Sequence, residues 1–166
     1  MVYEHSRLVA GKALTVALAR GFDGNALKFI EEAALLHDIG VVGTGSLRLG
    51  CQGTAPYLCH GILGREILER EGYPEHALVC ERHIGVGLTT EDIILQDLPL
   101  PHRDMTPVTI SERIICFADL FYTKKPAHID RELTVDEVRL GLSRFGEGKI
   151  RIFEEWLREF LPATRR

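Results

Sequence analysis

The stretch Ala33-Ala34-Leu35-Leu36-His37-Asp38-Ile39-Gly40 places an imidazole and a carboxylate side by side in an otherwise apolar run. Together with Ile30, its apolar residues follow the i, i+3, i+4, i+7 spacing of a helix, which puts His37 on the inward face. The glycine after the pair is a typical helix end. A buried charge needs a partner, and a metal ion can bind both groups. The alternative is a helix end with a hydrogen-bonded histidine and a solvated aspartate.

Outward from this stretch, apolar periodicity and capping signals predict helices along most of the chain. We expect them at about 4–20, 25–38, 56–70, 75–83, 109–122, 134–144 and 148–161. Thr109 to Glu112 and Thr134 to Glu137 have the pattern of capping boxes. The segments 41–55, which is rich in glycine, and 89–107, which is rich in proline, read as irregular loops. Strand signals are nearly absent, so the predicted fold is all-α.

The composition favours one globular domain spanning residues 1–166. The chain is 45% hydrophobic and has a net charge of −4. Its Lys and Arg residues are scattered, which argues against a nucleic-acid polymer or an anionic membrane as partner. No apolar run reaches the roughly 20 residues of a membrane span, and the start lacks a secretory signal pattern. The four cysteines lack metal-binding spacings and read as reduced thiols, which predicts a cytoplasmic protein.

Further polar residues are anomalous in the same way as His37 and Asp38. Asp119 is the one charge between Ile114 and Tyr122, so it must be paired, protonated or metal-bound if its helix is buried. Each remaining histidine, taken alone, is an ordinary packed or exposed side chain. As a set, however, four histidines and two carboxylates fall on five predicted helices, enough ligands for two metals with Asp38 as the bridge: His5, His37, Asp38, His60, His83 and Asp119. His76 lies seven residues before His83 on about the same helix face, so spacing leaves it open, but we rank it lower because it falls in the first turn after Pro74. We expect His102 and His128 to be exposed to solvent.

In this order the residues resemble a known signature. His5, the pair His37-Asp38 and Asp119 resemble the H…HD…D pattern of the HD superfamily of metal-dependent phosphohydrolases, in its HDIG form. The resemblance implies an HD-domain helical bundle of five core helices over about 3–125, followed by a helical extension over about 130–162. His60-Gly61 and His83-Ile84-Gly85 resemble the extra histidines of subgroups with a dinuclear centre. The resemblance thus implies one metal on His5, His37, Asp38 and Asp119, and a second on Asp38, His60 and His83.

The sequence departs from the patterns of two subgroups, and these departures argue against the substrates of those subgroups. Gly72-Tyr73-Pro74 precedes His83, whereas the GYP tripeptide of HD-GYP cyclic-dinucleotide phosphodiesterases follows the histidine pair, so we read it as a helix connector. The segment after Asp119 lacks the acidic Glu-Pro pattern typical of the diadenosine tetraphosphate hydrolases. The chain looks closest to archaeal and bacterial HDIG proteins without a settled substrate.

The resemblance implies hydrolysis of a phosphoester or phosphoanhydride, as in a nucleotide, by a hydroxide that one or two divalent metals (Fe, Mn, Zn, Ni or Mg) activate. His37 and Asp38 would be the catalytic pair. Arg48, Arg103 and Lys124 are candidates for binding phosphate, the alternative being solvated surface charges. Two other classes stay open: a di-iron oxygenase of the same fold, and a non-catalytic nucleotide-binding or metal-binding protein. Ile150, Phe153, Trp156, Leu157 and Phe160 form an apolar stripe that we expect to be core, or otherwise a homodimer seam.

Overall fold

The computed structural model describes residues 1–124 and 131–161, and within these ranges it contains helices and no strand. Two isolated bridges, Thr44 with Ala55 and Leu88 with Met105, are the described β-type pairings. The all-α prediction is therefore confirmed. The α-helices are α1 (Val2–Ala19), α2 (Gly24–Leu36), α3 (His60–Arg70), α4 (Pro74–Arg82), α5 (Thr90–Leu95), α6 (Ile110–Asp119), α7 (Val135–Leu142) and α8 (Glu147–Phe160). Short 3-10 turns are η1 (Ile39–Gly43), η2 (Leu47–Leu49), η3 (Tyr57–Cys59) and η5 (Ser143–Phe145).

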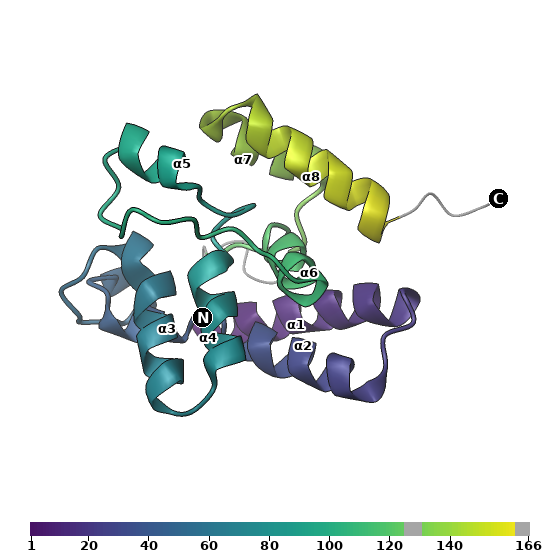
Figure 1. Cartoon of the computed structure of the whole chain (residues 1–166), viewed down its shortest axis with the longest axis horizontal. Coiled ribbons are helices and arrows are strands. Elements are labelled where there is room, and N and C mark those ends of the chain that lie inside the picture. Colours follow the sequence, from purple (N-terminus) through teal and green to yellow (C-terminus); the bar gives the residue numbers. More distant parts are fainter. Residues whose placement is uncertain (125–130, 162–166) are drawn as a thin grey trace.

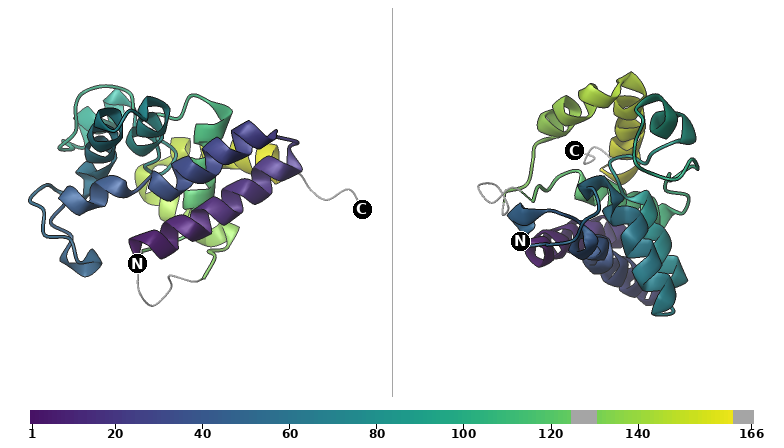
Figure 2. Two further views of the ribbon diagram at one scale, coloured as in Figure 1. Left: turned by 90° about the horizontal axis from the view of Figure 1, so that it is seen from below. Right: turned by 90° about the vertical axis from the view of Figure 1, so that its left-hand side faces the viewer.

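Helix α6 lies at the centre of the arrangement. The pairs α1 with α2 and α3 with α4 pack side by side, and α6 contacts α1, α2, α4 and α8 (Figures 1 and 2). Its Phe117 is fully buried, and the Phe117 ring lies 6.0 Å from Phe153 and 5.3 Å from Phe160 of α8. The apolar core therefore continues from the first two helices through α6 into the C-terminal helices.

The C-terminal stripe predicted as core is buried as expected. Phe153, Trp156 and Phe160 are at most 4% exposed, while Ile150 and Leu157 are partly buried against the same cluster. This burial favours the core interpretation over a dimer seam. None of the helices in the described ranges has the length and apolar character that crossing a bilayer requires.

Helix ends mostly follow their capping signals. Thr134 and Glu137 form the predicted capping box at the start of α7. At the start of α6 only half of the predicted box forms, because Thr109 accepts from the Glu112 amide but the Glu112 carboxylate accepts from the Val108 amide at 2.7 Å. Helix α6 ends at Asp119 instead of Tyr122, and α2 ends at Leu36 instead of Asp38. The metal-binding candidates therefore stand at helix ends.

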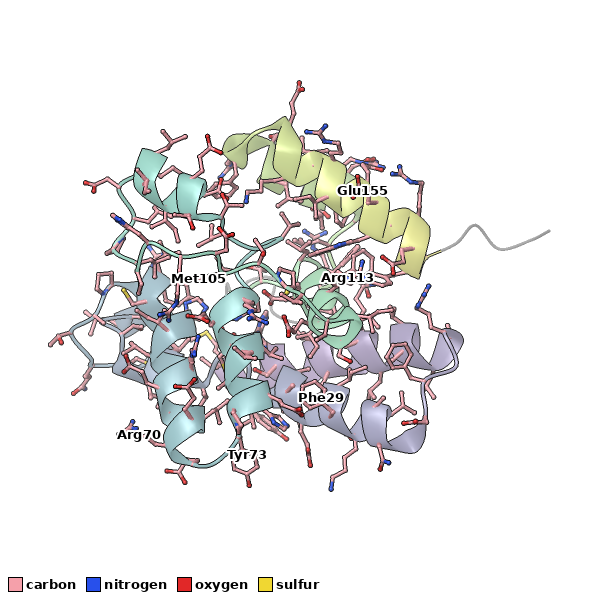
Figure 3. All side chains as sticks on the ribbon, viewed as in Figure 1. Phe29, Arg70, Tyr73, Met105, Arg113 and Glu155 are labelled. Atoms are coloured by element: carbon pink, nitrogen blue, oxygen red, sulfur yellow. The ribbon has the colours of Figure 1, made fainter. Side chains whose placement is uncertain are left out.

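The segment 89–107 is not wholly irregular, which corrects one prediction. Helix α5 begins there with a capping box in which Thr89 and Asp92 exchange side-chain to backbone hydrogen bonds. The Thr-x-x-Asp signal is visible in the sequence, but its helix is only six residues long and proline-rich sequence follows it. Beneath α5 lies a second small core that includes Ile93, Leu100 and Met105, the last labelled in Figure 3.

The glycine-rich segment 41–55 closes on itself at its base. The Gly45 amide donates to the Ala55 carbonyl at 2.9 Å, beside the Thr44 to Ala55 bridge. A Cβ on Gly53 would lie 2.1 Å from the Gly43 carbonyl oxygen, so only glycine allows this approach. The closed base presents residues 46–52, with the exposed Arg48, as a loop.

Candidate metal centre

The structure brings together the six side chains that the sequence singled out as ligands. His5 comes from the first turns of α1, His37 and Asp38 follow α2, His60 opens α3, His83 follows α4, and Asp119 ends α6. The five residues other than Asp119 are at most 4% exposed, and the Asp119 side chain is 15% exposed. Residues at or next to the ends of five helices thus meet in one buried cluster. The partly exposed Asp119 connects this cluster to the protein surface.

Asp38 lies between two groups of histidines. Its Oδ2 atom is 3.1 Å from His37 Nε2 and 3.4 Å from His5 Nε2. Its Oδ1 atom is 3.4 Å from His60 Nε2 and 3.6 Å from His83 Nε2. Each carboxylate oxygen therefore faces a different histidine pair, which is the arrangement that a bridging ligand requires.

We call the group of His5, His37, Asp119 and Asp38 Oδ2 the outer half-site, because it includes the partly exposed Asp119. Its His5 Nε2 lies 2.9 Å and its His37 Nε2 lies 3.6 Å from Asp119 Oδ1. The inner half-site is His60, His83 and Asp38 Oδ1. Ligand atoms lie within 4.8 Å of one another in two sets of three: His5, His37 and Asp119, and His37, Asp38 and His83.

Backbone carbonyls fix the orientation of three of the imidazoles. His37 Nδ1 lies 2.6 Å from the Ala34 carbonyl, His60 Nδ1 lies 2.7 Å from that of Tyr57, and His83 Nδ1 lies 2.8 Å from that of Cys80. A carbonyl oxygen only accepts, so each Nδ1 carries the proton and donates it. In the neutral ring the lone pair is then on Nε2, which points into the cluster. Metal-ligating histidines usually donate their other ring N–H to a carbonyl or carboxylate in this way.

Several buried atoms of the cluster form no hydrogen bond with a described residue: His37 Nε2, both Asp38 oxygens and both His5 nitrogens. Their contacts are with charged or titratable groups, such as Lys124 Nζ, 2.8 Å from Asp38 Oδ2, and Asp119 Oδ1, 2.9 Å from His5 Nε2. The Nε2 atoms of His60 and His83 are 3.0 Å apart, and in the neutral rings both carry lone pairs, because both Nδ1 atoms donate to carbonyls. Lone pairs facing one another at this distance need a proton or a cation between them. The residues present therefore fit bound cations in both half-sites.

The charges of the cluster shift its pKa values in opposite directions. Burial raises the pKa of Asp38, but His37 and Lys124 outweigh it and hold that pKa well below its usual range. Burial lowers the pKa of His37, but Asp38 and Asp119 raise it to about 10. Burial and the neighbouring His83 lower the pKa of His60 to about 4. Without a metal, His37 of the outer half-site thus holds a proton at neutral pH, whereas burial lowers the pKa of His5 and His60 stays neutral.

A pocket of about 500 Å³ opens onto Asp119. It is lined by Ser46, Arg48, Leu49, Tyr57, Asp119, Tyr122, Thr123 and Lys124. Two of the predicted phosphate-binding residues, Arg48 and Lys124, are therefore in its wall. Tyr57 and Tyr122 were not singled out from the sequence, where nothing distinguishes them from other tyrosines.

Arg103, the third predicted phosphate-binding residue, does not line the pocket that contains Arg48 and Lys124. Its Nε donates to Glu81 Oε1 at 2.9 Å, and Arg65 binds the other oxygen of the same carboxylate. Glu81 is only 2% exposed, so it needs both cations as partners. Arg103 thus joins its loop to α4 and does not line the pocket at Asp119.

The other histidines stay apart from the cluster as expected, as far as they are described. His76 is half-buried against Phe29 and lies 3.5 Å from Glu32, and His102 is exposed. His128 lies outside the described residues. Gly72 and Tyr73 connect α3 to α4, and Pro74 is the first residue of α4, as the helix-connector interpretation predicted.

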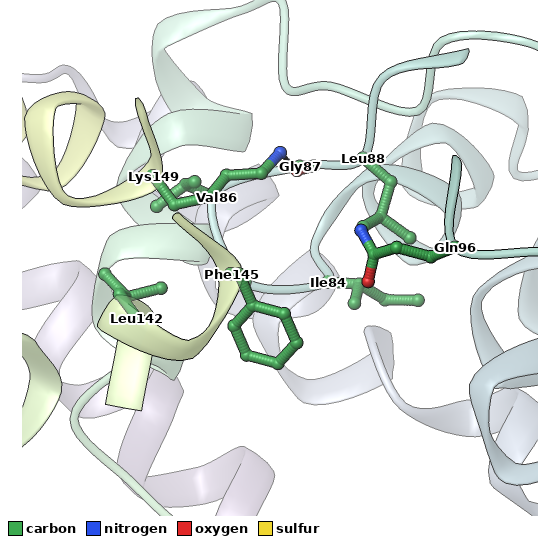
Figure 4. Close-up of a pocket in the computed structure, with 9 residues that line it drawn as sticks. Ile84, Val86, Gly87, Leu88, Gln96, Leu142, Phe145 and Lys149 are labelled. Carbon is green, nitrogen blue, oxygen red and sulfur yellow. Dashed lines mark hydrogen bonds between the residues drawn. The ribbon is translucent and has the colours of Figure 1, made fainter. Parts of the chain in front are cut away.

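A second, smaller pocket of about 140 Å³ has a different character (Figure 4). It lies where the loop after His83 meets the C-terminal helices, and its side chains are mostly apolar, with Leu142 and Phe145 among them. Its one cation, Lys149, binds the Gly87 carbonyl and Asp92. No carboxylate or histidine lines it, so this pocket does not reach the cluster.

Comparisons with known proteins agree with this geometry. Residues 2–123, which include all six clustered side chains, match the HD domain. The chain is 37% identical over 145 residues to the uncharacterized protein MJ0778 of Methanocaldococcus jannaschii, covering 84% of this chain and 78% of that protein. It is also 36% identical over 93 residues to a Picrophilus torridus protein named tRNA (cytidine(56)-2'-O)-methyltransferase, covering 55% of this chain and 24% of that protein. No solved structure matches.

Proposed function

Because the chain belongs to the HD domain family, whose members form a superfamily of metal-dependent phosphohydrolases, we propose that it hydrolyses a phosphoester or phosphoanhydride. HD domains bind divalent metals, and the chain has the His and Asp cluster for them. The proposal adds that two ions bind and that the substrate is a small phosphorylated molecule, in particular a nucleotide.

The contact between His60 and His83 supports the two-metal proposal most directly. Their Nε2 atoms lie 3.0 Å apart on the Oδ1 side of Asp38, while His5 and His37 lie on its Oδ2 side. A single ion in the outer half-site would leave the inner lone pairs opposed. We therefore assign one ion to His5, His37, Asp38 and Asp119, and a second to Asp38, His60 and His83.

The chain's own residues account for most of the proposed mechanism. When bound, divalent ions would supply positive charge to the phosphate and would lower the pKa of an attacking water. Asp38 and Asp119 would hold the ions, and the backbone carbonyls keep His37, His60 and His83 in the tautomer that leaves Nε2 free to ligate. Lys124 and Arg48 neutralise phosphate oxygens from the pocket side. No side-chain nucleophile is required.

The pocket walls support a nucleotide as substrate. The Tyr57 ring stacks on the His60 ring, with centroids 4.8 Å apart and planes at 28°, and it is 43% exposed in the pocket wall, where a base would stack against it. Tyr122 adds a second aromatic wall, and Ser46 and Thr123 add hydroxyl groups. Arg48 forms no ion pair with a described residue and is exposed, as a group that binds an incoming anion must be. These groups match the base, sugar and phosphate of a nucleotide.

The test measures metal content and turnover together. Purified protein is analysed for metals and assayed against nucleotides, simple phosphoesters and a short phosphorylated RNA, the last because one relative is named for tRNA methylation. We expect Asp38→Asn to lose both ions and all turnover, because it weakens both half-sites. Asp136→Asn is the control, since Asp136 is an exposed carboxylate on α7. An Asp38→Asn variant that keeps its metals and its activity would overturn the proposal.

The two alternative classes predict other outcomes of the same assays. An oxygenase of this fold requires dioxygen, so turnover of a phosphoester under strict anaerobiosis favours the hydrolase. A binding protein gives tight nucleotide binding without product. Product formation with loss in Asp38→Asn excludes that class.

A further inference from the structure

Lys124 contacts the carboxylate that the two half-sites share. It follows the end of α6, five residues after Asp119, and its Nζ lies 2.8 Å from Asp38 Oδ2. The Lys124 side chain is 17% exposed and that of Asp38 is 1% exposed, so the ammonium reaches inward from the pocket wall. The pair thus links the substrate pocket to the interior of the centre.

The contacted oxygen belongs to the outer half-site. Asp38 Oδ2 faces His5 Nε2 and His37 Nε2, whereas Oδ1 faces the inner histidines. A divalent ion held by His5, His37 and Oδ2 would sit against the Lys124 ammonium. Two cations repel strongly in a buried setting, so ammonium and outer ion compete for one oxygen. The inner half-site has no such competitor among the described residues.

Lys124 also lines the pocket, where a bound phosphate would be an alternative partner for its ammonium. The pocket that it lines together with Arg48 and Tyr57 is the one to which we assign the substrate phosphate. A lysine ammonium on a flexible four-carbon stem can move between two anions that lie on either side of it. A phosphate in the pocket would therefore draw Lys124 away from Asp38.

We propose that Lys124 couples substrate binding to occupancy of the outer half-site. Without substrate it pairs with Asp38 and weakens binding of the outer ion; with a phosphate in the pocket it binds the phosphate and releases Asp38 Oδ2. This rests on the proposed function, since it takes the pocket as the substrate site. Because coupling is reciprocal, the outer ion also strengthens phosphate binding. The inner ion stays bound in both states.

The test measures binding of Mn²⁺ by equilibrium dialysis or calorimetry, without any turnover. Wild-type protein is expected to bind one Mn²⁺ tightly and a second weakly, with inorganic phosphate tightening the second. Lys124→Met removes the competing charge and keeps the length of the stem. It should bind the second ion on the order of tenfold more tightly without phosphate, and phosphate should then tighten it less.

Arg48→Met is the matched control. It removes a cation from the same pocket, but Arg48 makes no contact with Asp38 in the described structure. Without phosphate, its second Mn²⁺ should bind as in wild type. If Lys124→Met binds the second ion no more tightly than wild type, or if Arg48→Met matches it, the coupling role of Lys124 is wrong while the metal centre stands. If wild type and both variants bind none of Mn²⁺, Fe²⁺, Zn²⁺, Ni²⁺ and Mg²⁺, the proposed function fails with it.

Discussion

A Cβ added to Gly40 would lie 2.2 Å from the backbone nitrogen of Gly64, so η1 and α3 touch through their main chains. The same Cβ would lie 2.0 Å from the His60 carbonyl oxygen. Gly64 in turn packs against Cys80 of α4, with a built Cβ 3.1 Å from its side chain. This contact sets the distance between Asp38, which precedes η1, and the two inner histidines.

Replacing Gly40 by alanine should therefore separate the two half-sites. We expect Gly40→Ala to lower the free energy of unfolding by about 1–3 kcal/mol or more, as overpacking of backbone does, and to abolish binding at the inner half-site. Urea unfolding and metal analysis measure the two effects. Gly11→Ala is the control, since a Cβ there meets nothing and alanine favours a helix by about 0.5–1 kcal/mol. Equal behaviour of the two variants would contradict this account.

The metal-free protein should be most stable near neutral pH. Burial lowers the pKa of His60 to about 4 from 6.5, so between these values the unfolded chain binds a proton that the native one does not. Stability therefore falls as the pH drops from about 6.5 to 4. The carboxylates outweigh burial and raise the pKa of His37 to about 10, which gives a contribution that is complete below pH 6.5 and is lost as the pH rises through 10.

Chemical unfolding from pH 4 to 10 in the presence of a chelator tests both signs. His37→Gln should lose the alkaline fall and keep the acid fall, whereas His60→Gln should do the reverse. Bound metal should also remove the alkaline fall, because a ligated His37 Nε2 carries no proton to lose. An alkaline fall that persists unchanged in His37→Gln would mean that other groups cause it.

Loss of the Arg103 side chain should lower stability, whereas loss of the Arg48 side chain should raise the KM. Arg103→Ala leaves the buried Glu81 with Arg65 alone, so we expect a loss of about 1–3 kcal/mol of stability with an unchanged KM. Arg48→Ala removes an exposed side chain and should change stability by less than about 0.5 kcal/mol. Its KM for the phosphorylated substrate should rise about tenfold, the equivalent of about 1.4 kcal/mol. Thermal melts and steady-state kinetics on both variants decide the assignment, and the reverse pattern would return Arg103 to the substrate site.

The C-terminal helices should unfold together with the rest of the chain. Phe153 of α8 is fully buried against Phe117 and Phe121, so Phe153→Ala should cost about 3–5 kcal/mol. Phe145→Ala is the control, because Phe145 is 60% exposed. One shared transition, followed by fluorescence and circular dichroism, supports the single domain predicted for residues 1–166. A separate early transition in Phe153→Ala would divide the chain in two.

His37, Asp38 and Asp119 could be predicted from the sequence because they interrupt apolar runs, whereas His5, His60 and His83 stood out only as members of a set that resembles a known signature. His37 and Asp119 are polar groups on helix faces that must be buried, and such groups need a specific partner. The helices themselves follow from periodicity and caps. Signals of this kind are local, and they identify which residues are unusual without saying where they point.

The ion-pair partners and the pocket lining could not be predicted from the sequence, because they depend on contacts between distant segments. Nothing near Arg103 indicates that its partner is Glu81, which lies 22 residues away on another element. Tyr57 becomes part of a pocket wall only because η3 brings its ring over His60. The link from Lys124 to Asp38 likewise joins segments that only the fold brings together.

Tyr57 serves the centre with two separate parts of the same residue. Its main-chain oxygen accepts the proton of His60 Nδ1, while its ring forms part of the pocket wall. Every amino acid at position 57 would supply that oxygen, so exchanging the side chain alters what the pocket admits without turning the imidazole. Proteins with this fold can therefore change substrate specificity through the side chain at position 57 and still keep the metal-binding residues in the same orientation.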